Sequence, residues 1–192
     1  MKLLIVRHGE SAANVDKSVY FKMPDWSIPL TEKGREQADK VGGVIAKHLE
    51  SVDECFLVYS PYVRAKQTMD IIEKHIPHYV PLYKKEHVLI YERLWGNLRE
   101  EYESFATREE RKHLFDFYRR PVGGESFADC YQRAFIFMNW LKEKKAMETE
   151  IAVIVSHGEF IKTMLMIIDN VKVEDFDTIP HVKNCELIIR HI

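Results

Sequence analysis

The chain has 192 residues and a mass of 22.7 kDa, with 46% hydrophobic and 30% charged residues, an ordinary balance for one globular domain. Its 28 Lys and Arg against 30 Asp and Glu give a formal net charge of −2, so a general basic field for nucleic acid or anionic membrane is excluded. Three cysteines without a CxxC pair, and apolar runs too short to cross a bilayer, argue against a secreted disulfide scaffold and a membrane protein. We expect a single cytoplasmic domain over residues 1–192, with no nucleic-acid or membrane partner. Composition leaves the oligomeric state open, a homodimer included.

Short aliphatic and β-branched runs alternate with longer helical patterns, which is typical of a sheet covered by helices on both faces. We therefore predict an α/β fold, a three-layer α/β/α sandwich. Its sheet is mostly parallel, and one edge strand is a candidate for antiparallel pairing. The predicted strands are 2–6, 56–59, 87–91, 151–155 and 186–190.

Three helices follow from apolar residues at helical spacing. The first has Thr31 as its N-cap, the second has Pro61 in its first turn, and the third follows the break at Gly123-Gly124. Their apolar faces consist of Ala38, Val41, Ile45 and Leu49; of Ala65, Met69 and Ile72; and of Phe127, Cys130, Ala134, Met138 and Leu141. Two long insertions, about 16–29 and 98–121, fit this scheme less well and are predicted lid segments.

Polar side chains follow four of the predicted strands. They are Arg7-His8-Gly9-Glu10-Ser11 with Asn14, then Ser60-Pro61 with Arg64, then Glu92 with Trp95-Gly96-Asn97, and finally Ser156-His157-Gly158. In open α/β sheets the ligand crevice lies outside the carboxyl ends of the strands. If the strands are parallel neighbours, two arginines, two histidines and one glutamate converge on one spot.

This set of side chains suits phosphoryl transfer. Arginine pairs bidentately with phosphate oxygens and stays charged at any working pH. A histidine beside such a pocket is either a general base or a nucleophile that takes the phosphoryl group onto nitrogen. A glutamate near the leaving oxygen can protonate it and then deprotonate the attacking water. The pattern therefore predicts phosphoryl transfer through a phosphohistidine.

The same residues carry a family resemblance. Residues 7–11, Arg64 in Ser-Pro-x-x-Arg-Ala-x-x-Thr, Glu92 and Ser156-His157-Gly158 resemble the histidine phosphatase superfamily, also called the phosphoglycerate mutase-like family. Pro29-Leu30-Thr31-Glu32-x-Gly34 and Gly123-Gly124-Glu125-Ser126 are similar to its supporting motifs, and the match runs in order from residue 4 to about residue 160.

The resemblance implies a role for each matching residue. His8 would be the phosphorylated nucleophile, with its other ring nitrogen held by a backbone carbonyl. Arg7, Arg64 and His157 would surround the phosphoryl group, and Glu92 would be the general acid and then the base, with Glu86 as the alternative. Asn14, Ser11 and the backbone N–H of Gly158 would complete the substrate-binding shell. The scheme requires no metal and no cofactor.

Other polar residues carry weaker hypotheses. His75 and His78 have a metal-like spacing, but Pro77 lies between them and further ligands are distant in sequence, so we predict no metal site. The charges of 108–120 alternate as on a solvated helix face. Arg119 and Arg120 are the exception, since lid arginines could hold the non-reacting end of an anionic substrate.

Three functions compete: a phosphatase (a phosphoric monoester hydrolase), a mutase acting within a sugar acid, and a non-catalytic protein that binds phosphorylated ligands. Family mutases are longer and carry a tyrosine and an asparagine where this chain has Trp95 and Glu159, whereas Arg119-Arg120 resembles the mutase lid. We favour the phosphatase, acting on a small phosphorylated substrate whose identity the sequence leaves open. Five aromatic residues either form a rim for that substrate or pack the lid: Tyr20, Phe21, Trp26, Trp95 and Phe105.

Overall fold

Five strands form one sheet in the computed structural model of the chain, which describes residues 1–96, 115–145 and 150–192. The strands are β1 (Lys2–Arg7), β2 (Cys55–Tyr59), β3 (Leu82–Glu86), β4 (Ile151–Ser156) and β5 (Leu187–His191). Their order across the sheet is β3-β2-β4-β1-β5; every neighbouring pair is parallel except β1 with β5. The prediction of a mostly parallel sheet with an antiparallel edge strand is confirmed.

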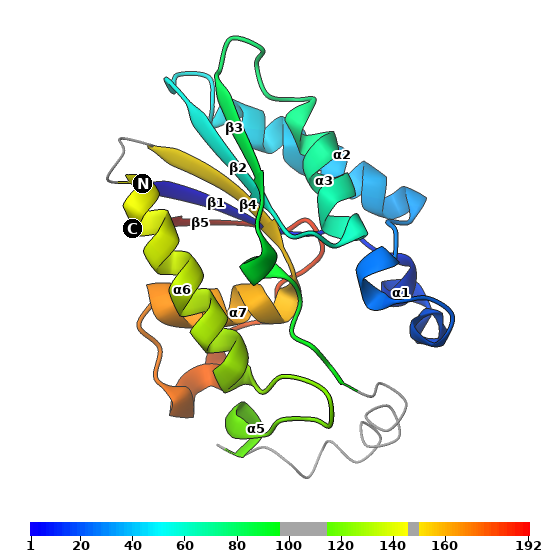
Figure 1. Cartoon of the computed structure of the whole chain (residues 1–192). Coiled ribbons are helices and arrows are strands. Elements are labelled where there is room, and N and C mark those ends of the chain that lie inside the picture. The colour runs from blue at the N-terminus through cyan, green and yellow to red at the C-terminus, as the bar shows by residue number, and fades with distance from the viewer. Residues whose placement is uncertain (97–114, 146–149) are drawn as a thin grey trace.

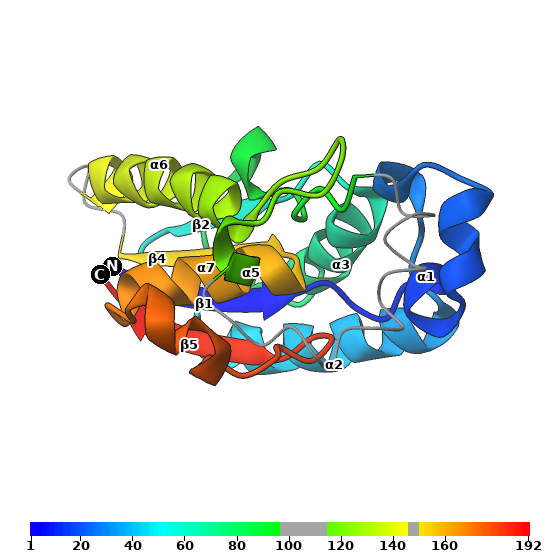
Figure 2. The same cartoon turned by 90° about the horizontal axis from the view of Figure 1, so that it is seen from below.

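Helices cover both faces of this sheet. Helices α2 and α3 pack on one face, and α6 and α7 pack on the other (Figures 1 and 2). The α-helices are α1 (Ala12–Val15), α2 (Glu32–Lys47), α3 (Val63–Glu73), α5 (Phe115–Tyr118), α6 (Phe127–Lys145) and α7 (Gly158–Ile168); the 3-10 helices are η1 (Lys17–Phe21), η2 (Asp25–Ser27), η3 (Val88–Ile90) and η5 (Val173–Thr178). The predicted three-layer α/β/α sandwich is therefore confirmed.

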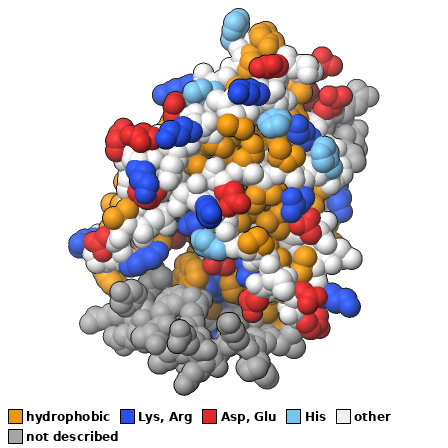
Figure 3. All heavy atoms as spheres, turned by 180° about the vertical axis from the view of Figure 1, so that it is seen from behind, with side chains coloured by type: hydrophobic (Ala, Val, Ile, Leu, Met, Phe, Trp, Pro, Cys, Tyr) orange, Lys and Arg blue, Asp and Glu red, His pale blue; other side chains and the backbone are white. Residues whose placement is uncertain are grey.

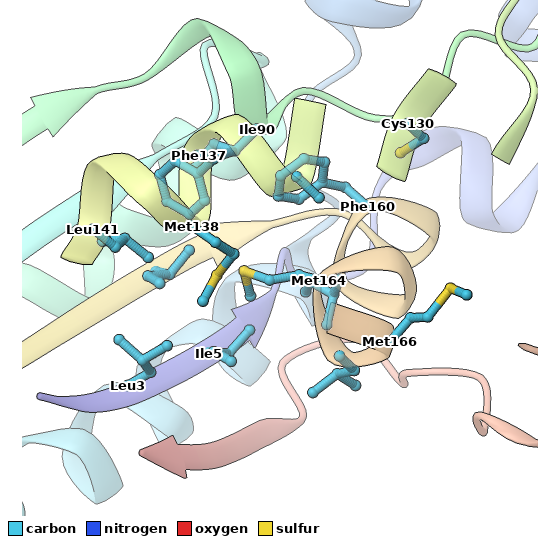
Figure 4. Close-up of a cluster of buried hydrophobic side chains, with 14 of the residues drawn as sticks. Leu3, Ile5, Ile90, Cys130, Phe137, Met138, Leu141, Phe160, Met164 and Met166 are labelled. Carbon is cyan, nitrogen blue, oxygen red and sulfur yellow. The ribbon is translucent and has the colours of Figure 1, made fainter. Parts of the chain in front are cut away.

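Alternation along the central strands divides the core into two halves. Leu4 and Val6 of β1 point to α2 and α3, whereas Leu3 and Ile5 point to α6 and α7. Figure 4 shows Leu3 and Ile5 beside the side chains that α6 and α7 bury. Those labelled there are Cys130, Phe137, Met138, Leu141, Phe160, Met164 and Met166. Each fully buried aliphatic or aromatic side chain contributes about 1.5–3 kcal/mol, so the central strands are the most firmly held part of the sheet.

The start of α2 fixes the loop that follows β1. The Thr31 hydroxyl accepts a hydrogen bond from the Gly34 N–H at 3.0 Å, so Thr31 is the N-cap that the sequence predicts. A Cβ on Gly34 would overlap the backbone carbonyl of Glu10, so only glycine lets the two segments lie this close. Thr31 N–H also donates to that Glu10 carbonyl at 2.9 Å. The start of α2 thereby holds the loop that follows β1 in place.

The strand predicted at 87–91 is wrong. The third strand lies earlier, at Leu82–Glu86, and Val88–Ile90 forms the 3-10 helix η3. β3 is an edge strand with mainly exposed side chains, so it lacks the apolar run that marks a buried strand. In η3 only Ile90 is buried, while Val88 is 66% exposed. A smaller correction concerns Pro61, which precedes α3 rather than lying in its first turn.

The two insertions differ in how much of them the structure describes. Residues 16–29 fold into η1 and η2, beside α1 (Figure 1). Of 98–121, residues 98–114 lie outside the described residues, so their role as a lid stays a prediction. Phe117 of α5 packs against Phe127 and Phe176, which joins the end of this insertion to the core.

The surface agrees with the balanced composition. Figure 3 shows acidic and basic side chains interspersed over the face turned away in Figure 1. No helix among the described residues is long and apolar enough to cross a membrane. The two termini lie side by side, with the Met1 amino group 2.9 Å from the Ile192 carbonyl oxygen (Figures 1 and 2).

Candidate active site

A cavity of about 340 Å³ opens where β1, β2 and β4 end. Seven of the residues predicted from the sequence line it: Arg7, His8, Ser11, Asn14, Arg64, Glu92 and Gly158. Lys17, Tyr20, Phe21, Trp95, Glu159 and His181 complete its described walls. Residues far apart in the chain meet here because parallel strands present their carboxyl ends at one edge of the sheet.

His8 is held in one tautomer. Its ring is 2% exposed, and Nδ1 lies 2.7 Å from the Gly9 carbonyl oxygen, which can only accept, so Nδ1 carries the proton. Nε2 accepts a hydrogen bond from Arg64 Nε at 3.2 Å. Burial, reinforced by the charges of Arg64 and Arg7, holds the pKa of His8 well below its ordinary value. The imidazole is therefore neutral, with its lone pair on the nitrogen beside Arg64.

The two arginines are anchored by groups outside the motifs. Arg64 Nη1 donates to the Asp25 carbonyl at 2.6 Å and to Asp25 Oδ1 at 2.8 Å. Arg7 Nη1 donates to the Val182 carbonyl at 2.7 Å and lies 2.9 Å from His181 Nε2. Arg7 Nε is buried without a hydrogen-bond partner among the described residues. Buried donors without partners are rare, so this atom is available to an oxyanion.

His157 lies beside His8 at the end of β4, with 5.0 Å between the ring centroids. Its Nε2 is 2.7 Å from Ser60 Oγ, which already accepts from the Tyr62 N–H at 3.3 Å. Among the described residues His157 Nε2 is the acceptor within reach of the Ser60 hydroxyl proton, so the buried hydroxyl donates to Nε2 and the His157 proton resides on Nδ1. That Nδ1 is buried and has no partner among the described residues. It is a second orphaned donor beside the cavity.

Glu92 is a buried carboxyl group in a protonatable state. It is 9% exposed, and burial, then the charge of Glu159, raises its pKa to about 7. Its Oε1 accepts a hydrogen bond from the Arg93 N–H at 2.9 Å. Glu86, the alternative acid, is exposed at the end of β3 and does not line the cavity. Glu92 is therefore the carboxyl that can exchange a proton with a bound ligand near neutral pH.

Asn14, Ser11 and Gly158 contribute neutral polar groups. Asn14 Oδ1 accepts from Ser11 N–H at 3.0 Å, from Ser11 Oγ at 3.1 Å and from Asn184 Nδ2 at 3.2 Å. With Oδ1 occupied, Nδ2 is the remaining polar atom of Asn14 at the cavity. Gly158 is the first residue of α7, so its N–H belongs to the positive end of an 11-residue helix. This wall suits an anion.

Comparison with known proteins identifies the family of the chain. The model of the histidine phosphatase superfamily (branch 1) matches residues 3–192. The chain belongs to this superfamily. The resemblance predicted from the motifs is confirmed, and superfamily members are phosphatases or mutases that share a phosphohistidine mechanism.

Three similar proteins show how widely the likeness extends. The phosphoglycerate mutase-like protein AT74H of Arabidopsis thaliana is 30% identical over 208 residues, covering 100% of this chain and 74% of that protein. A 2,3-bisphosphoglycerate-dependent phosphoglycerate mutase of Gloeobacter violaceus is 30% identical over 190 residues, covering 92% of this chain and 80% of its own length. The solved structure of Bacillus stearothermophilus YhfR has a TM-score of 0.74 at 26% identity, covering 98% of this chain and 89% of that one.

Some residues predicted for the site lie away from the cavity. Arg120 forms an ion pair with Asp129 at the start of α6, with Nε 2.8 Å from Oδ2, and Arg119 is exposed; neither lines the cavity. Among the rim candidates, Tyr20, Phe21 and Trp95 line it, whereas Trp26 is exposed on η2 and Phe105 lies outside the described residues. His75 of the metal-like pair bonds Asp39 at 2.8 Å, and the described residues hold no cluster of three or more metal-binding side chains.

Sequence reasoning also missed residues that shape the site. Asp25 anchors Arg64, Ser60 orients His157, and His181 contacts Arg7. Asn184 donates to the His8 carbonyl at 2.9 Å as well as to Asn14. A signal existed for Ser60 alone, because it stands inside the Ser-Pro-x-x-Arg motif, directly after a strand.

Proposed function

We propose that this protein is a metal-independent hydrolase of phosphate monoesters, acting through a phosphohistidine on His8. One observation carries the proposal: a neutral His8, its Nε2 lone pair beside Arg64, shares a cavity with Glu92, whose pKa is about 7. A nucleophile that needs no deprotonation thus lies beside an acid that is substantially protonated near neutral pH. The three free cysteines support a reducing compartment such as the cytoplasm.

The first step transfers the phosphoryl group to His8. Its Nε2 forms a bond to phosphorus while the ester P–O bond breaks, and the leaving oxygen takes the bonding electrons and a proton from Glu92. The Arg7 and Arg64 guanidinium groups and the His157 Nδ1–H stabilise the charge on the phosphoryl oxygens. Nδ1 of His8 keeps its proton, which it donates in the hydrogen bond to the Gly9 carbonyl oxygen, so the phosphorylated ring is cationic and a good leaving group.

The second step returns the enzyme to its starting state. The carboxylate of Glu92 now accepts a proton from water, whose oxygen attacks phosphorus. The P–N bond breaks, its electrons return to Nε2, and inorganic phosphate leaves with Glu92 protonated again. Each atom and proton is accounted for, and the guanidinium groups supply the positive charge that a metal ion supplies in other phosphatases.

A mutase is the alternative, since two relatives at 30% identity bear that name or likeness. A mutase must hold an acidic intermediate in place and keep water from the phosphohistidine. Glu159 places a negative charge on the cavity wall, and Arg120 is paired with Asp129 rather than directed at the cavity. Among the described residues both features disfavour binding of a sugar acid, which favours hydrolysis over the mutase reaction. A binding protein without activity is the third alternative, and a full set of competent side chains speaks against it.

The test is release of p-nitrophenol from p-nitrophenyl phosphate in excess EDTA by wild type, His8→Ala and His78→Ala. His78 is exposed and distant from the cavity, so it is the matched control. We expect turnover by wild type and by His78→Ala, and loss to background with His8→Ala. Activity in His8→Ala, or a loss in EDTA that one metal ion restores, would contradict the proposal.

Glu92→Gln tests the acid–base role in the same assay. The variant still forms the phosphohistidine from the aryl ester, whose leaving group needs no proton, and then hydrolyses it slowly. We expect a burst of nitrophenol equal to the enzyme concentration and an acid-labile phosphoprotein. Interconversion of 2- and 3-phosphoglycerate without phosphate release would instead establish the mutase.

A further inference from the structure

Two carboxyl groups share the cavity, and the chemistry uses only one of them. Glu92 and Glu159 both line it, Glu159 from the first turn of α7. Glu159 is partly exposed and makes no hydrogen bond or ion pair with the residues that the structure describes. An acidic residue in the first turn stabilises a helix by about 0.3–1 kcal/mol, and that role does not require a place on the cavity wall.

Glu159 shares the cavity with the group that protonates the leaving oxygen. As general acid, Glu92 must reach the ester oxygen, so the alcohol lies on the Glu92 side of the phosphoryl group. The charge of Glu159 acts on Glu92 and on Arg7. Lys17 lines the same cavity from η1, and its charge interacts with Arg7, Arg64, Asp25 and Glu92. Lys17 is thus a cationic group contributed to the cavity by η1, and Glu159 is an anionic group contributed by α7, next to the Gly158 N–H.

We propose that Glu159 selects the leaving group, so that the site prefers phosphate monoesters of uncharged or positively charged alcohols over those of sugar acids. This inference rests on the proposed function of the same cavity. The phosphate remains on Arg7 and Arg64, while the alcohol passes Glu159. A hydroxyl or ammonium group there donates a hydrogen bond to the carboxylate, whereas a substrate carboxylate meets a like charge in a partly dry site.

The expected size of the effect follows from Coulomb's law. Two like charges about 6 Å apart in a medium of effective dielectric constant about 20–40 repel enough to change an equilibrium or rate constant about tenfold or more. A hydrogen bond to the ionised carboxylate adds to the preference for the uncharged alcohol. We therefore expect discrimination of at least about tenfold at this wall.

The experiment compares two substrates that differ at one group, glycerol 3-phosphate and 3-phosphoglycerate. Both expel a primary alcohol, and a hydroxymethyl group in one replaces the carboxylate of the other. We expect kcat/KM of the wild type to favour glycerol 3-phosphate by at least tenfold, and Glu159→Gln to reduce that ratio about tenfold by improving 3-phosphoglycerate. Glu36→Gln, on the exposed face of α2, is the matched control and leaves the ratio unchanged. Phosphoethanolamine should lose activity in Glu159→Gln.

The pH dependence supplies a second readout that a structural role would not move. Removal of the Glu159 charge lowers the pKa of Glu92, so the alkaline limb of kcat/KM shifts to lower pH in Glu159→Gln. That change affects both esters equally and cancels in their ratio. An unchanged ratio in an active Glu159→Gln enzyme, or a wild type that prefers 3-phosphoglycerate, would overturn the inference and leave the proposed function intact.

A binding measurement separates the inference from catalysis. The affinities of the two esters for His8→Ala and for His8→Ala/Glu159→Gln are measured by calorimetry, which needs no turnover. We expect the double variant to gain about tenfold in relative affinity for 3-phosphoglycerate. If the wild type hydrolyses no ester at all, the proposed function fails. Separately, if the ratio of the affinities for the two esters is the same in the two variants, the selection by Glu159 is overturned.

Discussion

The buried carboxyl group of Glu92 makes the stability of the protein depend on pH in a direction that follows from its pKa. That pKa is about 7 in the folded state against an ordinary value of 4.5. The folded state therefore holds this proton more tightly than the unfolded state does. The stability that the protonated Glu92 carboxyl group contributes is complete below pH 4.5 and is lost as pH rises through about 7. A difference of about 2.5 pH units at about 1.36 kcal/mol each gives about 3 kcal/mol in total.

Urea unfolding of wild type and Glu92→Gln at pH 5 and pH 8 measures this contribution. Glutamine is uncharged throughout, so the difference in unfolding free energy between the two proteins isolates residue 92 from all other titrating groups. We expect Glu92→Gln to gain about 2–3 kcal/mol relative to wild type between pH 5 and pH 8. Glu36→Gln, an exposed control, should show no comparable change. An equal difference at both pH values would refute the argument that burial raises the pKa of Glu92.

Two further predictions concern Ser60 and the glycines of α2. Ser60→Ala leaves His157 Nε2 buried without its partner and should cost about 1–3 kcal/mol in the free energy of urea unfolding. The variant should also have a lower kcat/KM because the His157 ring loses the contact that orients it, and unchanged kinetics would show that Ser60 does not orient His157. Gly34→Ala should destabilise by about 1–3 kcal/mol or more because its Cβ overlaps the Glu10 carbonyl, whereas Gly43→Ala, which meets open space in the same helix, should stabilise by about 0.5–1 kcal/mol. Thermal unfolding measures the stability of both glycine variants, and equal shifts in Tm for Gly34→Ala and Gly43→Ala would contradict the steric explanation.

The sequence predicts the centre of the fold better than its edges, and the reason is burial. β1 and β4 are covered on both faces, so they appear in the sequence as continuous apolar runs. β3 pairs only with β2 at the sheet edge, and Lys84, Lys85 and Glu86 face water. Edge strands use charged residues to avoid pairing with other chains, which removes the hydrophobic signal. The strand was therefore predicted at the nearby apolar triplet 88–90, although only Ile90 is buried there.

The residues of the cavity could be predicted from the sequence better than the contacts that hold them in place. Arg7, His8 and Arg64 could be predicted because they lie at or just beyond the ends of parallel strands, which meet at one edge of the sheet. Glu92 was placed correctly although the strand predicted before it is the 3-10 helix η3. The contacts that anchor the side chains around the cavity could not be predicted, although Ser60 itself stands inside a motif. Arg64 and Asp25 are 39 residues apart, Ser60 and His157 are 97 apart, and Arg7 and His181 are 174 apart. Periodicity reports a local element, whereas contacts of this range depend on where each loop lies in the finished fold.

One physical effect prepares both reacting groups of the cavity. Desolvation disfavours whichever form of a group is charged, so it lowers the pKa of a histidine and raises that of a carboxylic acid. His8 is thereby neutral and nucleophilic, while Glu92 keeps a proton that it can donate. In water at pH 7 free glutamic acid would be ionised and histidine partly protonated, so burial supplies the two reactive forms together. The fixed charges of Arg7 and Arg64 then act chiefly on the phosphoryl group, and Glu159 adds a negative charge to the wall of the same cavity.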